Sequence, residues 1–273
     1  KLLHKVAGKQ LKKLFGGRMR LFAIGGAKFD SEAERFLLEG GFPYGIGYGL
    51  TETAPLIAGA VGNMVRIGST GPALPAVQIR LDNVNPDTKQ GEIVVKTPCC
   101  MVGYYKNEAA TKEAFTEDGW FRTGDLGAMA EDGWIFIKGR LKNMIVGPSG
   151  ENIYPEDIEE VLNSNRFVAE SVVTEQDGKL IALVHFNTEA LEEAYDEFKY
   201  KASVKVEQVQ LRMEEIKREV MEYVNSKVNR FSKISKVVDN EGEFEKTPTK
   251  KIRRFNYNKP SSSETPTQES EKK

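Results

Sequence analysis

Five short polar motifs are spaced along this chain, and each is flanked by apolar, strand-like sequence. In chain order they are Gly25-Gly26-Ala27, Tyr48-Gly49-Leu50-Thr51-Glu52-Thr53, Trp120-Phe121-Arg122-Thr123-Gly124-Asp125, Lys138-Gly139-Arg140-Leu141-Lys142 and Lys246-Thr247-Pro248-Thr249-Lys250-Lys251-Ile252-Arg253-Arg254. Small polar segments of this kind are typical of active-site loops carried on a rigid scaffold. Taken singly, each could also be an ordinary surface turn, and only their common order makes the functional interpretation specific.

The content and order of the motifs resemble those of the adenylate-forming (AMP-binding) superfamily, and most of all the bacterial long-chain fatty acyl-CoA ligases. The resemblance covers nearly all of residues 1–257, but only the later part of such an enzyme. It implies that a fatty acid attacks the α-phosphate of ATP, that pyrophosphate leaves, and that the thiol of coenzyme A then displaces AMP. Mg²⁺ is the implied metal, with ATP and coenzyme A as co-substrates.

The resemblance assigns the first motifs to the nucleotide base. Gly25, Gly26 and Ala27 would let the backbone approach the edge of adenine, because small residues leave room there. Tyr48, followed by Gly49, would present the face of its ring to the purine. A strand-terminating glycine pair is common, so this first motif carries little weight by itself.

The resemblance assigns four further side chains to the phosphates, the metal and the ribose. Thr51 would offer its hydroxyl to the α-phosphate, and Glu52 would be an oxygen ligand of Mg²⁺. Asp125 would accept hydrogen bonds from both ribose hydroxyls. Arg140 would reach ribose or phosphate oxygens.

The later positions are implied to serve catalysis and domain movement. Lys142 occupies the hinge position, about which a small C-terminal domain alternates between two orientations. Ser149 and Gly150 would line the tunnel for the pantetheine arm of coenzyme A. Lys251 matches the catalytic lysine, whose ammonium would stabilise charge in the adenylation step. The family usually has glycine before that lysine and this chain has Lys250, so either lysine could be the one that reaches the active site.

The elements that must position these residues follow from hydrophobic periodicity. The predicted fold class is α/β and α+β: the end of a large N-terminal domain, followed by a small mobile α+β domain. Residues 1–62 are expected to form a partial parallel α/β subdomain, and residues 63–140 a β-barrel-like subdomain. Residues 141–257 are expected to form the small domain, and residues 258–273, rich in Ser, Thr, Pro, Glu and Lys, a disordered tail.

Individual helices and strands are predicted within these segments. Helices are expected over 1–15, 31–40, from 155 and over 206–228, and strands over 21–24, 44–48, 77–81, 92–96, 126–130, 134–138, 169–174 and 180–186. Ser31 is the expected N-cap of the second helix. The apolar stripes of the first helix and of the long helix are expected to pack inside the protein rather than to contact lipid.

Composition excludes several other classes of function. The 39 basic and 40 acidic residues leave a net charge of -1, so no nucleic-acid partner is expected. Cys99 and Cys100 are adjacent, which suits neither a structural disulfide nor a metal cluster, and a reduced, cytoplasmic location is therefore predicted. His4 and His185 have no partner cluster, so histidine-based nucleophilic catalysis lacks support. Apolar runs are too short to span a bilayer, and peripheral contact with a membrane surface stays an alternative.

The superfamily also carries a phosphate loop rich in Ser, Thr and Gly upstream of the motifs seen here, and this chain has no such stretch. The chain is therefore expected to be a fragment that is inactive alone and that works with the missing N-terminal part of the same enzyme. One alternative is a ligase for another carboxylate, or one with a carrier-protein thiol as acceptor. A second alternative is a non-catalytic AMP- or CoA-binding module, which the presence of Lys251 disfavours because a pure binder has little need of that lysine.

Overall fold

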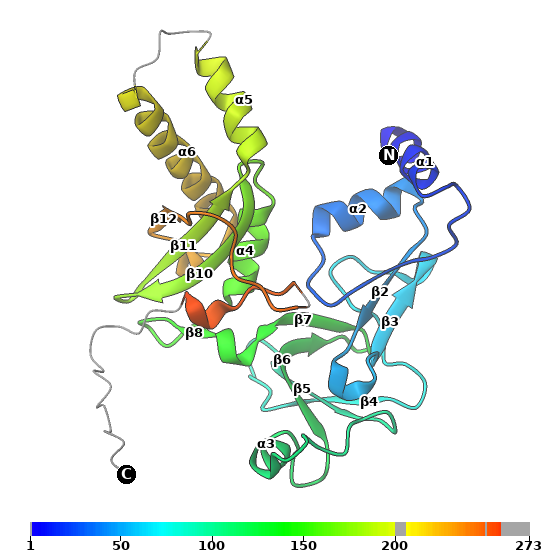
Figure 1. Ribbon diagram of the computed structural model, residues 1–273. Coiled ribbons are helices and arrows are strands. Elements are labelled where there is room, and N and C mark those ends of the chain that lie inside the picture. Colours follow the sequence, from blue (N-terminus) through cyan, green and yellow to red (C-terminus); the bar gives the residue numbers. More distant parts are fainter. Residues whose placement is uncertain (1, 200–205, 249, 258–273) are drawn as a thin grey trace. The chain divides into compact units, whose positions relative to one another are not determined.

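The computed structural model describes residues 2–199, 206–248 and 250–257 (Figure 1). The chain divides into two compact units, Lys1–Lys142 and Asn143–Lys273. Each unit is described by itself below. The predicted tail, 258–273, lies outside the described residues.

The first unit begins with two helices that lie against each other (Figure 1). They are α1 (Leu2–Leu14) and α2 (Ser31–Gly40). Their backbones meet at two glycines, since a Cβ on Gly8 would lie only 2.4 Å from the carbonyl oxygen of Gly40. The N-cap of α2 is Asp30, which accepts a hydrogen bond from the Ala33 amide, and not the predicted Ser31.

A three-stranded sheet, ordered β1-β2-β3, adjoins these helices. It contains β1 (Phe22–Gly25), β2 (Tyr44–Tyr48) and β3 (Ala58–Val61). The first two strands are parallel, as the strand–helix–strand order predicts, and β3 runs antiparallel to β2. The short helices η1 (Thr51–Thr53) and η2 (Gly62–Met64) precede and follow β3.

The apolar stripe of α1 only partly fulfils its expected packing role. Leu11 packs against the core formed by Phe42, Tyr44 and other residues of the first sheet. By contrast, Leu2, Leu3 and Leu14 are each about four-fifths exposed, at 80%, 78% and 82%. Within this unit the expected packing is therefore seen at Leu11 and not at these three leucines.

The second sheet of the same unit is an antiparallel meander. It contains β4 (Gln78–Asp82), β5 (Gln90–Lys96), β6 (Phe121–Met129) and β7 (Ile135–Arg140), hydrogen-bonded in that order. Helix α3 (Glu108–Glu113) lies between β5 and β6. Among the described strands β4 does not pair with β7, so the sheet is open and not the predicted barrel. Its core includes Ile57, Ile93 and Ile135, all fully buried.

The second unit is an α+β domain. The short helix η3 (Leu141–Asn143) spans the division between the units. The elements that follow it are β8 (Ile145–Val146), β9 (Asn152–Ile153), α4 (Pro155–Asn163), β10 (Val168–Gln176), β11 (Lys179–Phe186), α5 (Thr188–Lys199), α6 (Val206–Lys227), η4 (Arg230–Ser232), β12 (Lys236–Asp239) and η5 (Arg254–Asn256). The strands β10 and β11 are antiparallel, and β12 adds to β11 in parallel.

The long helix α6 supplies much of the core of this second unit. Ile216, Val220 and Val224 are fully buried, as the predicted stripe requires, and Met213 packs beside them. The side chain of Val209, the first member of that stripe, lies outside the described residues. None of the described helices is long and apolar enough to cross a membrane.

Candidate functional site

Three of the predicted site residues meet at one carboxylate in the first unit. Asp125 in β6 is the register partner of Arg140 in β7. The Arg140 Nε lies 2.8 Å from Asp125 Oδ1, and the Tyr48 hydroxyl donates to Asp125 Oδ2 at 2.6 Å. Three motifs that are far apart in the sequence therefore converge on a residue that is only 4% exposed.

Burial and the charge of Asp125 keep the Tyr48 hydroxyl protonated. Burial raises the pKa of Tyr48 well above its ordinary value, and the negative charge of Asp125 raises the pKa further. The phenol therefore keeps its proton and acts as a donor. A second bond from Arg140, from Nη1 to the Thr123 carbonyl at 3.1 Å, fixes the guanidinium along the strand. The Arg140 side chain is nevertheless 44% exposed, so it can contact a ligand as well.

Asp125 lies inside a strand that is longer than predicted. The sequence predicted a strand over 126–130, but β6 begins at Phe121 and includes Asp125. Both of its carboxylate oxygens have protein partners. A carboxylate has about four lone-pair directions, so a bidentate ribose contact would share oxygens that already hold the site together.

The segment after β2 is shaped by one close approach and one buried hydroxyl. A Cβ on Gly49 would lie 1.7 Å from the carbonyl oxygen of Pro55, so only glycine fits at this position. Thr53 is fully buried, and its Oγ1 accepts from the Leu50 amide at 3.1 Å and donates to the Leu50 carbonyl at 2.9 Å. This arrangement leaves Thr51 exposed at the start of η1.

Glu52, in the same short helix, has two contacts with the loop that follows β5. The Tyr104 hydroxyl donates to Glu52 Oε1 at 3.0 Å, and the Met101 amide donates to the Glu52 carbonyl oxygen at 2.7 Å. Burial, followed by the hydrogen bond to Glu52, raises the pKa of Tyr104. The phenol is thus a proton donor to Glu52, which the sequence analysis did not foresee.

The donor set at Glu52 fits a magnesium ion that is shared with a nucleotide. Among the described residues, no group of three or more His, Cys, Asp or Glu side chains could hold a metal alone. Mg²⁺ is usually bound through one or two carboxylates together with substrate phosphates and water, so a single half-exposed carboxylate is adequate.

The first glycine motif lies beside the second in the fold. Gly25 is the register partner of Gly47 in β2, one residue before Tyr48. Gly26 follows with φ 90°, a conformation that glycine adopts without strain. The two motifs therefore share the carboxyl ends of neighbouring parallel strands, which is the usual place for ligands in open α/β sheets.

The predicted hinge and the predicted tunnel residues lie close in sequence to the division between the two units. Lys142 is exposed, lies in η3, and is the last residue of the first unit. Ser149 and Gly150 lie in the loop between β8 and β9, where Gly150 has φ 82° and its amide donates to the Gly147 carbonyl at 2.9 Å. The Ser149 amide donates to Glu151 Oε2 at 3.1 Å.

Lys250 and Lys251 lie on an exposed turn of the second unit. The Thr247 amide donates to the Lys251 carbonyl at 2.8 Å, and a bridge between Lys246 and Ile252 closes the turn. Lys250 has φ 60°, which explains why glycine suits this position. Lys251 and Asp125 belong to different units, so the positions of Lys250 and Lys251 are described within the second unit alone.

A buried ion pair anchors the end of this turn. The Arg254 guanidinium binds the Glu159 carboxylate of α4 through both oxygens, with Nη1 at 2.6 Å from Oε1. Glu159 Oε1 also accepts from the Val173 amide of β10 at 2.6 Å. The segment that carries the two lysines is therefore attached to the core of its own unit.

Comparison with known proteins agrees with these observations. Residues 1–105 match the family model described as AMP-binding enzyme. The long-chain-fatty-acid–CoA ligase FadD15 of Mycobacterium bovis is 36% identical over 185 residues, which are 67% of this chain and 30% of that protein. The 2-succinylbenzoate–CoA ligase of Bacillus licheniformis is 42% identical over 137 residues, 48% of this chain and 28% of that protein.

Solved structures agree at the level of the fold. The o-succinylbenzoate CoA synthetase (MenE) of Bacillus subtilis, in complex with its acyl-adenylate intermediate, matches with a TM-score of 0.71 and 25% identity, over 92% of this chain and 49% of that chain. The chain belongs to the AMP-binding, adenylate-forming superfamily. A structure of the same enzyme with ATP and a magnesium ion matches with a TM-score of 0.69 and 26% identity, over 86% of this chain and 46% of that chain.

The mixed α/β fold of this chain matches about half of the solved CoA synthetase structure. The chain spans about a third of the length of the curated relatives that it matches. Three residues that contact the motif segments had no role in the sequence analysis: Thr53, Tyr104 and Glu159. Thr53 could have been found as the buried member of the second motif, whereas the other two act through partners far away in the sequence.

Proposed function

We propose that the protein is an AMP-forming CoA ligase, which activates a carboxylic acid with ATP and transfers the acyl group to coenzyme A. The observation that carries this proposal is the convergence of Tyr48, Asp125 and Arg140 at the end of the strand that leads into Thr51 and Glu52. A simple structural ion pair would not require a glycine loop, an exposed threonine and a half-exposed glutamate beside it.

The residues of the first unit would divide the work of binding ATP. The Tyr48 ring and the glycines after β1 would hold the base, while Asp125 and Arg140 would hold the ribose. Thr51 would donate its hydroxyl to the α-phosphate, and Glu52 would hold Mg²⁺, which neutralises charge on the phosphates when it is bound. The acid could then attack the α-phosphorus while pyrophosphate leaves.

The residues of the second unit would complete the two half-reactions. The ammonium of Lys251 would approach the carboxylate and the α-phosphate oxygens during adenylation. Movement about Lys142 would then exchange the lysine turn for the loop that carries Ser149 and Gly150. Two observations support this proposal: the division of the chain falls directly after Lys142, and a Cβ on Gly150 would meet open space.

The proposed substrate class is a long-chain fatty acid. Its support is the match to FadD15, which covers 67% of this chain. An aromatic acid of the succinylbenzoate type is the second candidate, favoured by the higher identity to the Bacillus licheniformis ligase over a shorter segment. The two candidates share the adenylation chemistry and differ only in the pocket for the acyl group.

The test is a substrate screen with the complete polypeptide encoded by the gene. ATP, Mg²⁺ and coenzyme A would be supplied with a series of fatty acids and with 2-succinylbenzoate, and AMP and acyl-CoA followed by mass spectrometry. We expect acyl-CoA to form, with a maximum at long chains. Release of pyrophosphate without a CoA thioester would indicate a carrier-protein acceptor, and no turnover of any acid would favour a nucleotide-binding module.

A further inference from the structure

The loop between β5 and α3 lies outside all five motifs, yet it contacts Glu52 at two points. The Met101 amide fixes the backbone of Glu52 at 2.7 Å, and the Tyr104 hydroxyl fixes its carboxylate at 3.0 Å. These contacts join residues about fifty positions apart within one compact unit. Glu52 is thus held at both its main chain and its side chain by the same loop.

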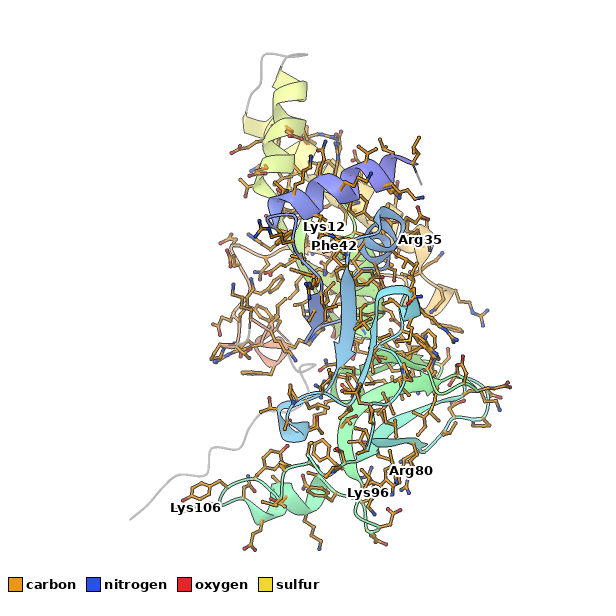
Figure 2. All side chains as sticks on the ribbon, turned by 90° about the vertical axis from the view of Figure 1, so that its right-hand side faces the viewer. Lys12, Arg35, Phe42, Arg80, Lys96 and Lys106 are labelled. Carbon is orange, nitrogen blue, oxygen red and sulfur yellow. The ribbon has the colours of Figure 1, made fainter. Side chains whose placement is uncertain are left out.

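The loop is itself held by the helix that follows it. The Tyr104 amide donates to Thr111 Oγ1 at 2.9 Å, and the Thr111 hydroxyl donates to the Asn107 carbonyl at 2.8 Å. Asn107 caps α3 by accepting from the Ala110 amide at 3.0 Å. In Figure 2 the labelled Lys106 marks the outer end of this loop, beside α3. The phenol therefore reaches Glu52 from a fixed support.

We propose that Tyr104 is a positioning residue that orients the carboxylate of Glu52 for a divalent cation bound with a nucleotide. This inference rests on the proposed function. A glutamate side chain has several rotatable bonds, and a donor to Oε1 selects one orientation in which lone pairs of the other oxygen can bind the metal. Partners that orient a metal ligand in this way typically change metal affinity or activity 10- to 100-fold when they are removed.

A purely structural role for the Tyr104 ring is the competing explanation. The ring lines an open cavity of about 500 Å³ together with Val102, Tyr105 and Lys112. Tyr104→Phe separates the two explanations, because it keeps the ring and removes only the hydroxyl. The matched control is Tyr105→Phe, since Tyr105 lines the same cavity, follows directly in the sequence and is 88% exposed.

The first readout does not depend on turnover. Binding of Mn²⁺ with ATP to the complete polypeptide would be measured by electron paramagnetic resonance, with Mn²⁺ as the probe in place of Mg²⁺. We expect Tyr104→Phe to weaken Mn²⁺ binding by about tenfold. Tyr105→Phe should leave it unchanged. In a Glu52→Gln background, Tyr104→Phe should have no further effect, because the carboxylate that it orients is gone.

The second readout is the Mg²⁺ dependence of adenylation. Tyr104→Phe should raise the Mg²⁺ concentration for half-maximal rate by about tenfold and leave the rate at saturating Mg²⁺ within about twofold. Should Tyr104→Phe fail to fold, Thr111→Val retains the phenol and loosens its support, and a smaller shift in the same direction is expected. Wild-type protein that binds no Mn²⁺ with ATP would reject the proposed function. If the wild-type protein binds Mn²⁺ with ATP and neither Tyr104→Phe nor Thr111→Val weakens this binding, only the positioning role of Tyr104 is rejected.

Discussion

The two units of this chain hold their functional side chains in opposite ways. In the first unit, Tyr48 and Arg140 both bind the buried carboxylate of Asp125, so the site is ordered before any ligand arrives. In the second unit, Lys250 and Lys251 are exposed on a turn, and the hydrogen bonds that they form with the described residues are made by backbone groups. Buried polar groups require partners, whereas an exposed lysine does not. Under the proposed function, the first unit would hold a preformed nucleotide site and the second would deliver a cation to it by domain movement.

The largest expected effect concerns the anchor of the lysine turn. Arg254→Met removes the partner of the buried Glu159, and breaking such a pair from one side costs about 3–5 kcal/mol of unfolding free energy. Urea denaturation would measure the loss. Lys217→Met is the matched control in the same unit, because its partner Glu214 is 70% exposed, and a loss below about 1 kcal/mol is expected. Equal losses in the two variants would contradict the contrast between buried and exposed pairs.

The same variant has a defined pH dependence. Burial raises the pKa of Glu159, and the Arg254 guanidinium opposes that rise. A carboxyl with a raised folded pKa stabilises the fold only at low pH, and this stability is lost as pH rises through the folded value. Arg254→Met removes the opposing charge and raises the pKa of Glu159 further. The loss of stability should therefore be largest above the raised folded pKa of Glu159 and shrink as pH falls through that value toward about 4.3, the ordinary value for glutamate.

Next in size is the effect of removing the proposed catalytic ammonium. Lys251→Ala should lower the rate of adenylation on the order of 10²–10³-fold, while thioester formation from a supplied acyl-adenylate is retained. Because Lys251 is exposed, the unfolding free energy of the protein should change by less than about 0.5 kcal/mol in this variant. Lys250→Ala is the matched control, and measurement of both half-reactions decides which lysine acts. Equal loss of both half-reactions in Lys251→Ala would contradict its assigned role.

A smaller stability effect tests the preformed site. Asp125→Ala leaves the Tyr48 hydroxyl buried without its acceptor, which costs about 1–3 kcal/mol, in addition to any loss of nucleotide binding. The matched control is Asp132→Ala, because the pair of Asp132 with Arg66 lies on the surface of the same unit, with the Asp132 side chain 51% exposed. Denaturation of both variants should show a clear loss only for Asp125→Ala.

The smallest expected effect concerns the backbone of the lysine turn. Lys250 has φ 60°, a conformation that costs most residues roughly 1–2 kcal/mol and glycine little. Because glycine also gains freedom in the unfolded chain, Lys250→Gly should stabilise the protein by a net amount of about 0.5–1 kcal/mol. Lys251→Gly, where φ is not positive, should instead destabilise by about the same amount. Thermal unfolding of the pair would reveal the opposite signs.

Local sequence signals predicted the elements that carry the site better than the contacts within it. The strand–helix–strand order before Tyr48 and the helix that begins at Pro155 are present in the structure, and each follows from periodicity and caps over a few residues. Closure of the second sheet was wrongly predicted, because alternation specifies strands but not whether the outermost strands pair. The placement of Asp125 opposite Arg140 depends on a bulge between Leu126 and Gly127, which no local pattern encodes.

Contacts between distant residues were beyond the reach of the sequence for the same reason. Tyr104 and Glu52, or Arg254 and Glu159, become neighbours only through the folding of each unit. The exposed leucines of α1 show the converse limit, since an apolar stripe indicates a helix face but not what covers it. The resemblance to a family supplied roles for residues, and the structure supplied the partners that hold them.

Detection of the acyl-adenylate is the most direct test of the central claim. The complete polypeptide would be mixed with ATP, Mg²⁺ and a long-chain fatty acid without coenzyme A, and the enzyme-bound species identified by mass spectrometry. We expect acyl-AMP to accumulate and to disappear, with formation of the CoA thioester, when coenzyme A is added. Binding of ATP without acyl-AMP, for every fatty or aromatic acid tried, would contradict the account and leave a nucleotide-binding module in its place.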